Sequence, residues 1–199
     1  MKLQLVLSIV LSMSGQLHSD RIVKYDRTGQ GLTSFPHDIP QDVDQILLGS
    51  NHISRIDYIE PLTDLDALTI PDNGLTEFPD CKNISKSLLK LSLENNKITV
   101  IPTERIRILI HLTSLSIYNN PLVSLPNFGV MPSPPSLSVT LINDKFACDW
   151  RMALVKHAMD AGKVVFLFHK PMCNVPRNLA GRSLEDISVQ DLIYSSNGK

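Results

Sequence analysis

Apolar residues recur along the chain in a fixed pattern, with an asparagine at the same place in each copy. Four segments carry apolar residues at positions 1, 4, 6 and 11 and asparagine at position 9. They begin at Val43, Leu65, Leu88 and Leu112, and their asparagines are Asn51, Asn73, Asn96 and Asn120, with steps of 22, 23 and 24 residues. A fifth, weaker copy has Asp144 instead of the asparagine, and its other pattern residues are Ser136, Val139, Leu141 and Phe146. One register held through several copies indicates a repeat architecture.

Each copy predicts a short strand followed by a turn. Positions 4 and 6 are apolar between mostly polar or small neighbours, which is the alternation of a half-buried strand. A further apolar residue, expected to close the far side of the core, comes three places after position 11, at Ile56, Phe78, Ile101 and Leu125. One copy cannot bury its apolar edge alone, whereas stacked copies can. The pattern therefore predicts an α/β solenoid, a short curved coil with parallel strands.

The asparagine of each copy lies where the strand bends into its turn. Backbone groups at such a bend would otherwise be buried without partners. A side-chain amide can both donate and accept hydrogen bonds there. We therefore expect the four asparagines to form a ladder of hydrogen bonds across the stacked copies.

This pattern resembles the extracellular leucine-rich-repeat family, and the similarity covers most of the chain. The resemblance implies a right-handed coil with its strands on the concave face and a cap at each end. Residues 31–40 resemble the end of the family's N-terminal cap. The family carries a cysteine cluster just upstream, but here no cysteine precedes Cys81. We expect residues 21–26 to form a plain strand over the open end.

The C-terminal cap carries the more specific similarity. Residues 144–150 occupy the first block of the family's cap motif, and residues 173–184 match the second block without a gap. The family pairs the first cysteine of this motif with the third and the second with the fourth. The resemblance therefore implies a disulfide between Cys148 and Cys173. Trp150 stands in place of the second cysteine, and Tyr194 lies near the place of the fourth.

Alternatives stay open within this cap. Cys148 and Cys173 could be separate thiols. Trp150 could pack against Tyr194 and partly replace the missing bridge, or it could be an ordinary core tryptophan. Between the cysteines, Asp149 is expected to cap a helix over residues 150–161, which Gly162 ends.

The start of the chain predicts a secretory signal peptide. Lys2 gives a positive start, residues 3–11 are mostly apolar, and small residues follow. The apolar stretch is about half of the ~20 residues that span a bilayer, so an anchoring helix is the weaker alternative. We expect cleavage near residues 14–19 and a secreted, extracellular mature chain without a membrane span. The expected order is signal peptide 1–19, N-terminal cap 20–42, about five repeats over 43–144, C-terminal cap 145–194 and tail 195–199.

Composition narrows the classes of function. The chain has 19 Lys and Arg against 20 Asp and Glu, and its net charge of -1 argues against nucleic-acid binding. Its six histidines show no metal-ligand spacing with cysteines or carboxylates, and no nucleophile or phosphate-binding motif occurs. We therefore expect no catalysis, no cofactor and no metal. A calcium ladder along position 8 is a weaker alternative to plain solvation of Asp72, Asn95, Asn119 and Asn143.

Two residues of the second repeat have a possible role outside the core. Cys81 follows Phe78 at a spacing that predicts a buried, small apolar residue, with intermolecular pairing as the alternative. Asn83 belongs to Asn83-Ile84-Ser85, the only Asn-x-Ser/Thr sequon of the sequence with a permitted middle residue. We expect Asn83 to face solvent on the outer surface and to carry a glycan, although the sequon could be unused.

The concave face is where proteins of this family usually bind partners. Positions 3, 5, 7 and 8 of each repeat should project onto it. The candidate partner-binding residues are Leu47, Thr69, Asp72, Lys90, Glu94, Ser116, Tyr118, Asn119 and Ile142. Binding energy at interfaces concentrates in Tyr, Trp and Arg, which makes Tyr118 the candidate hot spot. We expect a non-catalytic module that binds an extracellular protein in recognition, adhesion, defence or signalling. The alternative is a matrix or self-associating structural protein.

Overall fold

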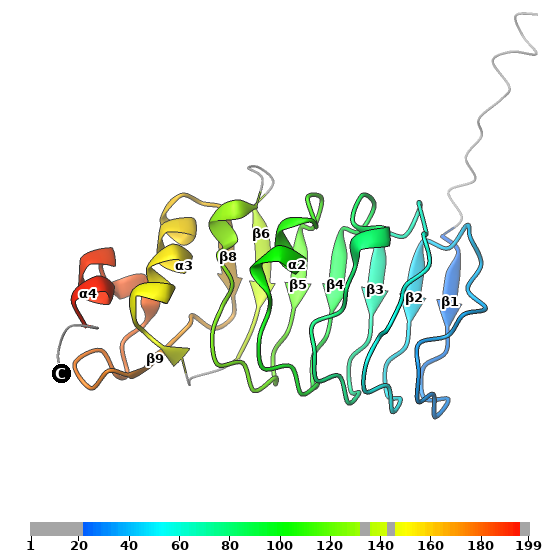
Figure 1. Cartoon of the computed structure of the whole chain (residues 1–199), viewed down its shortest axis with the longest axis horizontal. Coiled ribbons are helices and arrows are strands. Elements are labelled where there is room, and N and C mark those ends of the chain that lie inside the picture. The colour runs from blue at the N-terminus through cyan, green and yellow to red at the C-terminus, as the bar shows by residue number, and fades with distance from the viewer. Residues whose placement is uncertain (1–21, 132–135, 143–145, 196–199) are drawn as a thin grey trace, which may run out of the picture.

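The computed structural model describes residues 22–131, 136–142 and 146–195. Within them a seven-stranded parallel sheet runs in chain order along the molecule (Figure 1). Its strands are β1 (Lys24–Asp26), β2 (Gln45–Leu47), β3 (Ala67–Thr69), β4 (Lys90–Ser92), β5 (Ser114–Ser116), β6 (Leu137–Thr140) and β8 (Val164–Leu167). The expected signal peptide, Asn143, Asp144 and residues 196–199 of the expected tail lie outside the described residues.

The strands pair in the register that the repeat defines. Ile46 lies opposite Leu68, and the same line continues at position 4 through Leu91, Leu115 and Val139. These five side chains are buried, whereas the residues on either side of each in its strand are half-buried or exposed. The predicted α/β solenoid with parallel strands is therefore confirmed.

Short helical turns lie on the return path of the repeats. They are η1 (Lys82–Ile84), α2 (Thr103–Arg107) and η2 (Phe128–Val130). The apolar residues predicted to close the far side of the core do so at Phe78, Ile101 and Leu125, which are buried. Ile56 is only partly buried but packs against the same cluster. The core is accordingly a continuous aliphatic layer between the sheet and these turns.

The N-terminal end is closed by a plain strand. β1 pairs in parallel with β2 and extends the sheet by one strand. The carboxylate of Asp44 accepts a hydrogen bond from the backbone N–H of Val23 at 2.6 Å. The Tyr25 hydroxyl donates to Asp38, whose other oxygen lies 3.0 Å from the Arg27 guanidinium. Polar contacts thus hold this cap in a stretch that contains no cysteine.

The C-terminal end adds elements that the repeat does not predict. The helix expected between the cysteines is α3 (Trp150–Asp160), and Gly162 follows it with a φ of 68°. After this helix, β8 pairs with β6 as the last strand of the sheet. A second, two-stranded sheet consists of β7 (Phe146–Ala147) and β9 (Cys173–Val175), and the cap finishes with η3 (Leu184–Asp186) and α4 (Val189–Tyr194). Figure 1 places α3, β9 and α4 at the opposite end of the molecule from β1.

Candidate protein-binding surface

A ladder of asparagine side chains ties each repeat to the one before it. The side-chain oxygen of Asn96 accepts the Leu75 N–H at 2.9 Å, and its amide donates to the Ile70 carbonyl at 2.9 Å. Asn73 and Asn120 make the same pair of bonds to their preceding repeats. Asn51 makes them to the N-terminal cap, through the N–H groups of residues 30 and 32 and the carbonyl of residue 27. These bonds fix the strands relative to one another and so give the sheet face a rigid base.

A second ladder runs along position 8 of the repeats. Ser50, Asp72, Asn95 and Asn119 all have φ between 52° and 56°, a left-handed conformation that Asn and Asp adopt more readily than other non-glycine residues. The amide of Asn95 donates to Asp72 at 2.7 Å, and that of Asn119 donates to Asn95 at 2.7 Å. Side-chain oxygens of Asp72 and Asn95 therefore already accept hydrogen bonds from protein amides. No cluster of three or more His, Cys, Asp or Glu side chains suited to a metal ion occurs in the described part of the chain.

The candidate partner-binding residues lie along the strands and the turns that follow them. Leu47, Thr69 and Ser116 end their strands and are half-buried, while Lys90 begins β4 and is exposed. Three candidates in the turns are exposed, namely Asp72, Asn119 and Ile142. Glu94 and Tyr118 are half-buried, and Glu94 accepts a hydrogen bond from the Ser92 hydroxyl. These candidates therefore belong to one continuous side of the sheet.

The repeat pattern predicts Ile142 but misses three further exposed apolar residues toward the C-terminal end, namely Val165, Leu167 and Phe168. We call Ile142, Val165, Leu167 and Phe168 the C-terminal apolar patch; they are 42%, 46%, 37% and 88% exposed. The strand register sets Val165 beside Ser138 and Leu167 beside Thr140. Phe168 follows β8 with a φ of 67°, which is unusual for a bulky aromatic residue. In the sequence, the run of apolar residues 164–168 was the feature that could have indicated this group. Within it, Val164 and Phe166 turn to the core and their neighbours face solvent.

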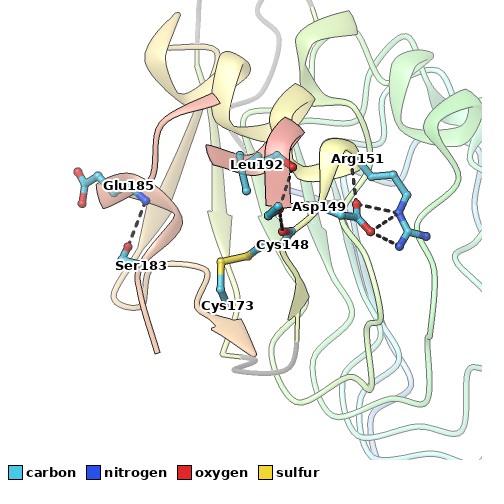
Figure 2. The surroundings of a disulfide bond; sticks show 8 residues. Cys148, Asp149, Arg151, Cys173, Ser183, Glu185 and Leu192 are labelled. Atoms are coloured by element: carbon cyan, nitrogen blue, oxygen red, sulfur yellow. Dashed lines mark hydrogen bonds and ion pairs between the residues drawn. A yellow bond between two sulfur atoms is a disulfide. The ribbon is translucent and has the colours of Figure 1, made fainter. Parts of the chain in front are cut away.

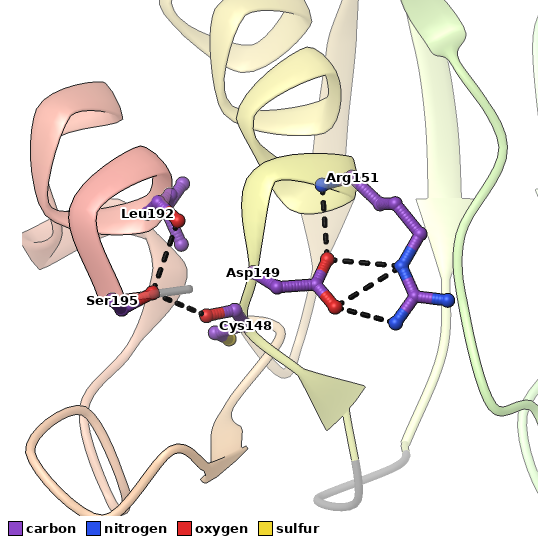
Figure 3. A network of polar contacts seen from close by, with 5 residues as sticks. All are labelled: Cys148, Asp149, Arg151, Leu192 and Ser195. Carbon is purple, nitrogen blue, oxygen red and sulfur yellow. Dashed lines mark hydrogen bonds and ion pairs between the residues drawn. The ribbon is translucent and has the colours of Figure 1, made fainter. Parts of the chain in front are cut away.

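A disulfide holds the C-terminal cap together. Cys148 and Cys173 are bonded and buried, which is the pairing that the resemblance implies (Figure 2). Next to Cys148, the carboxylate of Asp149 accepts the Arg151 N–H at 2.9 Å and also binds the Arg151 guanidinium. This hydrogen-bonded pair holds the pKa of Asp149 below its usual value. The Ser195 hydroxyl lies 3.2 Å from the Cys148 carbonyl and 3.0 Å from that of Leu192, which connects α4 to the bridge (Figure 3).

The hypothesis that Trp150 packs against Tyr194 is wrong, and so is the alternative of a core tryptophan. Their side chains are 58% and 69% exposed, and the aromatic pair found within the described residues is Phe128 with Phe166. Trp150 is the first residue of α3, and the buried side of that helix is formed by residues such as Met152 and Val155. Trp150 instead borders a cavity of about 320 Å³ beside the disulfide. Among the described residues, no contact between Trp150 and Tyr194 replaces the missing bridge.

Cys81 and Asn83 lie on the side of the second repeat away from the sheet. Cys81 is fully buried, and burial raises the pKa of its thiol to about 12. A buried, protonated thiol suits the core interpretation and not pairing with another molecule. Asn83 is exposed, in the turn η1. In the described part of the chain, no helix combines the length and the apolar character needed to cross a bilayer.

Comparison with known proteins identifies the fold. No protein-family model matches the sequence. The structure of human 5T4 (Wnt-activated inhibitory factor 1, trophoblast glycoprotein) superimposes with a TM-score of 0.61 and 19% identity, over 86% of this chain and 77% of that one. A chain of the octameric complex of Latrophilin 3, Unc5D and FLRT2, in which FLRT2 contributes the leucine-rich-repeat part, gives a TM-score of 0.62 and 23% identity. That match covers 79% of this chain and 56% of the other, so this chain spans little more than half of its length. With its parallel sheet, its asparagine ladder and these similarities, the chain has the fold of a leucine-rich-repeat solenoid.

Proposed function

We propose that this chain is a secreted, extracellular module without catalytic activity that binds another protein through the concave face of its sheet. The observation that carries the proposal is the C-terminal apolar patch, which lies exposed on a rigid face. Monomeric proteins rarely expose large contiguous apolar groups, and such groups mark interaction sites. Pairing with β6 holds β8 in place under Val165 and Leu167, so ordering these side chains on binding costs little conformational entropy.

The rest of the face has the composition of an interface rim. Ser92, Ser116 and Thr140 present hydroxyl groups between the apolar patch and the charged N-terminal half. Tyr118 is half-buried and lies in the turn that follows β5. β5 pairs with β6, and β6 pairs with β8, which carries part of the patch. Binding sites usually combine apolar anchors with polar residues beside them. Phe168 is the principal anchor by exposure and residue type, whereas Tyr118 follows β5, which β6 separates from β8.

Three further observations support the proposed extracellular location and the class of partner. The predicted signal peptide directs the chain to the secretory pathway. A buried disulfide persists in oxidising compartments, which include the extracellular space. The FLRT2 leucine-rich-repeat part is present in a complex with Latrophilin 3 and Unc5D, which supports an extracellular protein as the class of partner.

Replacement of Phe168 by alanine tests the proposal. The immobilised mature chain is used to capture secreted proteins, and each captured protein is identified. Its affinity for the wild type and for each variant is then measured by surface plasmon resonance. Loss of a central aromatic anchor costs about 2 kcal/mol or more, so we expect Phe168→Ala to weaken binding by roughly 30-fold. Val123→Ala is the matched control, because Val123 is 59% exposed and lies in a turn outside the patch. Equal affinity of the wild type and Phe168→Ala for the partner would contradict the proposal.

Self-association is the competing function, and the same variants separate it. If the patch joined two copies, light scattering after gel filtration would show a mass that rises with concentration and falls in Phe168→Ala. A monomer at all concentrations, together with a captured partner that requires Phe168, supports the binding module.

A further inference from the structure

The outer surface of the second repeat carries the one sequon of the sequence in a conformation that leaves room for a sugar. Asn83 lies in the middle of η1, exposed to solvent, and Ser85 follows two residues later. Ile84 between them is buried, so it anchors the turn to the core. The modified side chain would therefore have a fixed place on the surface.

Only one N–H of the Asn83 amide is used by the protein. The side-chain nitrogen donates to the carbonyl of Ile59 in the preceding repeat at 2.8 Å, and this is the hydrogen bond that this side chain makes to the described residues. A primary amide has two N–H groups. An N-linked sugar replaces one hydrogen and leaves the other, so the bond to Ile59 can persist after modification. The inter-repeat contact and the glycan are thus compatible.

A cavity beside Asn83 has room for the first sugar and a mostly apolar lining with polar groups at its border. It has a volume of about 460 Å³ and is bordered by Asn83, Thr63, Ser87 and the two lysines Lys82 and Lys86. Buried Leu62 and Ile84 form its apolar part. Hydroxyl groups of a sugar can hydrogen-bond to Thr63 and Ser87, while its apolar ring face covers the aliphatic residues.

We infer that Asn83 carries an N-linked glycan whose first N-acetylhexosamine occupies this cavity. The donor is an oligosaccharide on a polyprenyl pyrophosphate. The Asn83 side-chain nitrogen forms a bond to the anomeric carbon as the bond from that carbon to the phosphate oxygen breaks. The amide loses one proton to a base of the transferase, and the lipid pyrophosphate leaves with the electron pair. No oxidant or reductant takes part.

The folded structure also indicates when the transfer takes place. The Ser85 hydroxyl donates to the Lys82 carbonyl at 2.8 Å, and Ile84 is buried. A transferase that binds the sequon as an extended segment would have to break this hydrogen bond and lift Ile84 out of the core. The sugar is therefore added to the unfolded chain as it enters the secretory pathway. The cavity receives the sugar when the first and second repeats stack.

Expression in a eukaryotic secretory system tests the modification. We expect the wild type to lose mass on treatment with peptide-N-glycosidase F, with Asn83 converted to Asp in the peptide map. Asn83→Gln and Ser85→Ala should be secreted without the glycan, whereas Ser85→Thr should keep it. Ser87→Ala is the matched control, because Ser87 borders the same cavity but lies outside the sequon, and it should stay modified. An unmodified Asn83 in the secreted wild type would overturn the inference.

Limited proteolysis tests the position of the sugar. Lys82 and Lys86 are exposed and border the cavity, so a sugar there should slow tryptic cleavage after both residues by about tenfold relative to Asn83→Gln. Cleavage after Lys97, which is exposed in the turn that follows Asn96, serves as the internal reference and should not change. Equal cleavage after Lys82 and Lys86 in the two proteins would place the glycan outside the cavity.

Discussion

Asparagine serves two purposes at adjacent positions of the third repeat. Asn96 is buried, and its side chain makes hydrogen bonds to a backbone N–H and a backbone carbonyl of the second repeat. Asn95 is half-exposed, adopts the left-handed conformation with a φ of 53°, and bonds to Asp72. The first residue satisfies backbone groups in the core, while the second shapes the turn that carries the binding face.

The two roles predict different costs of substitution. Asn96→Ala leaves the buried Leu75 N–H and Ile70 carbonyl without partners, and each such group costs ~1–3 kcal/mol. We expect the free energy of unfolding in urea to fall by about 3 kcal/mol. Asn95→Gly is the control, since glycine keeps the positive φ, and its cost should stay below about 1 kcal/mol. Similar losses for both variants would show that the inter-repeat bonds contribute little.

The polar cluster of the N-terminal cap predicts a dependence of stability on pH. The Tyr25 hydroxyl, donating to Asp38, lowers the pKa of that carboxyl, and the Arg27 guanidinium adds to the effect. A carboxyl whose folded pKa lies below its unfolded value stabilises the protein above the unfolded pKa of about 4 and stops doing so as pH falls through the folded pKa. The melting temperature of the wild type should therefore exceed that of Asp38→Asn by a constant amount from pH 5 to 7, and the difference should shrink below about pH 4.

A matched variant isolates this effect. Asp57→Asn removes an exposed carboxylate that pairs, among the described residues, with Arg55, also exposed, at 2.5 Å. Exposed ion pairs contribute little to stability, so its melting temperature should follow that of the wild type at each pH. If the difference in melting temperature between the wild type and Asp38→Asn did not change with pH, the pKa of Asp38 would be the same in the folded and unfolded states.

At the scale of elements, the two caps use different means to close the sheet. β1 is held by the contacts of Tyr25 and Asp38 and by Asn51, whereas the C-terminal cap depends on a covalent bond between β9 and the residue that follows β7. α3 and α4 pack against each other, and Ser195 connects α4 to the disulfide. The C-terminal cap must also position β8, which supplies Val165 and Leu167 of the apolar patch and leads into Phe168.

Loss of the disulfide should consequently loosen the cap that carries the binding site. The cysteines are separated by 25 residues, and closing a loop of this length stabilises a protein by about 3–4 kcal/mol. We expect the double variant Cys148→Ala, Cys173→Ala to lose that amount of unfolding free energy in urea. Trp150→Ala, an exposed substitution in the same cap, should stay within about 0.5 kcal/mol of the wild type. A large loss in Trp150→Ala would restore a structural role for that side chain.

At the scale of the whole molecule, the concave face changes in character from one end to the other. The N-terminal half carries charges of both signs, among them Lys24, Asp26, Lys90 and Glu94. The middle carries hydroxyl groups, and the far end carries the C-terminal apolar patch. A partner that covers the face would therefore be guided by charge at one end and anchored by apolar contact at the other. A glycan on Asn83, in the turn η1 on the return path of its repeat, would leave this face open.

The fold was predictable because one signal recurs. The apolar positions 4 and 6 and the asparagine occur in each of four copies. Each copy must bury its apolar edge against a neighbouring copy, so this one requirement places all of the repeat strands in the same sheet. The helix α3 was also predictable, because Asp149 and Gly162 are local start and stop signals. β8 was not, since it belongs to no repeat and periodicity alone does not distinguish a short apolar run in a strand from one in a buried helix.

The sequence by itself determined the solenoid and its register, because these depend on spacing along the chain, whereas the pairing of Cys148 with Cys173 was implied by the resemblance to the family's cap motif. The tertiary structure alone decided which apolar side chains remain in water. Val165, Leu167 and Phe168 are as apolar as their buried neighbours, and Trp150 has the residue type of a core anchor. Their exposure depends on which face of an end element meets the core, and that is fixed by the packing of the cap against the last repeat.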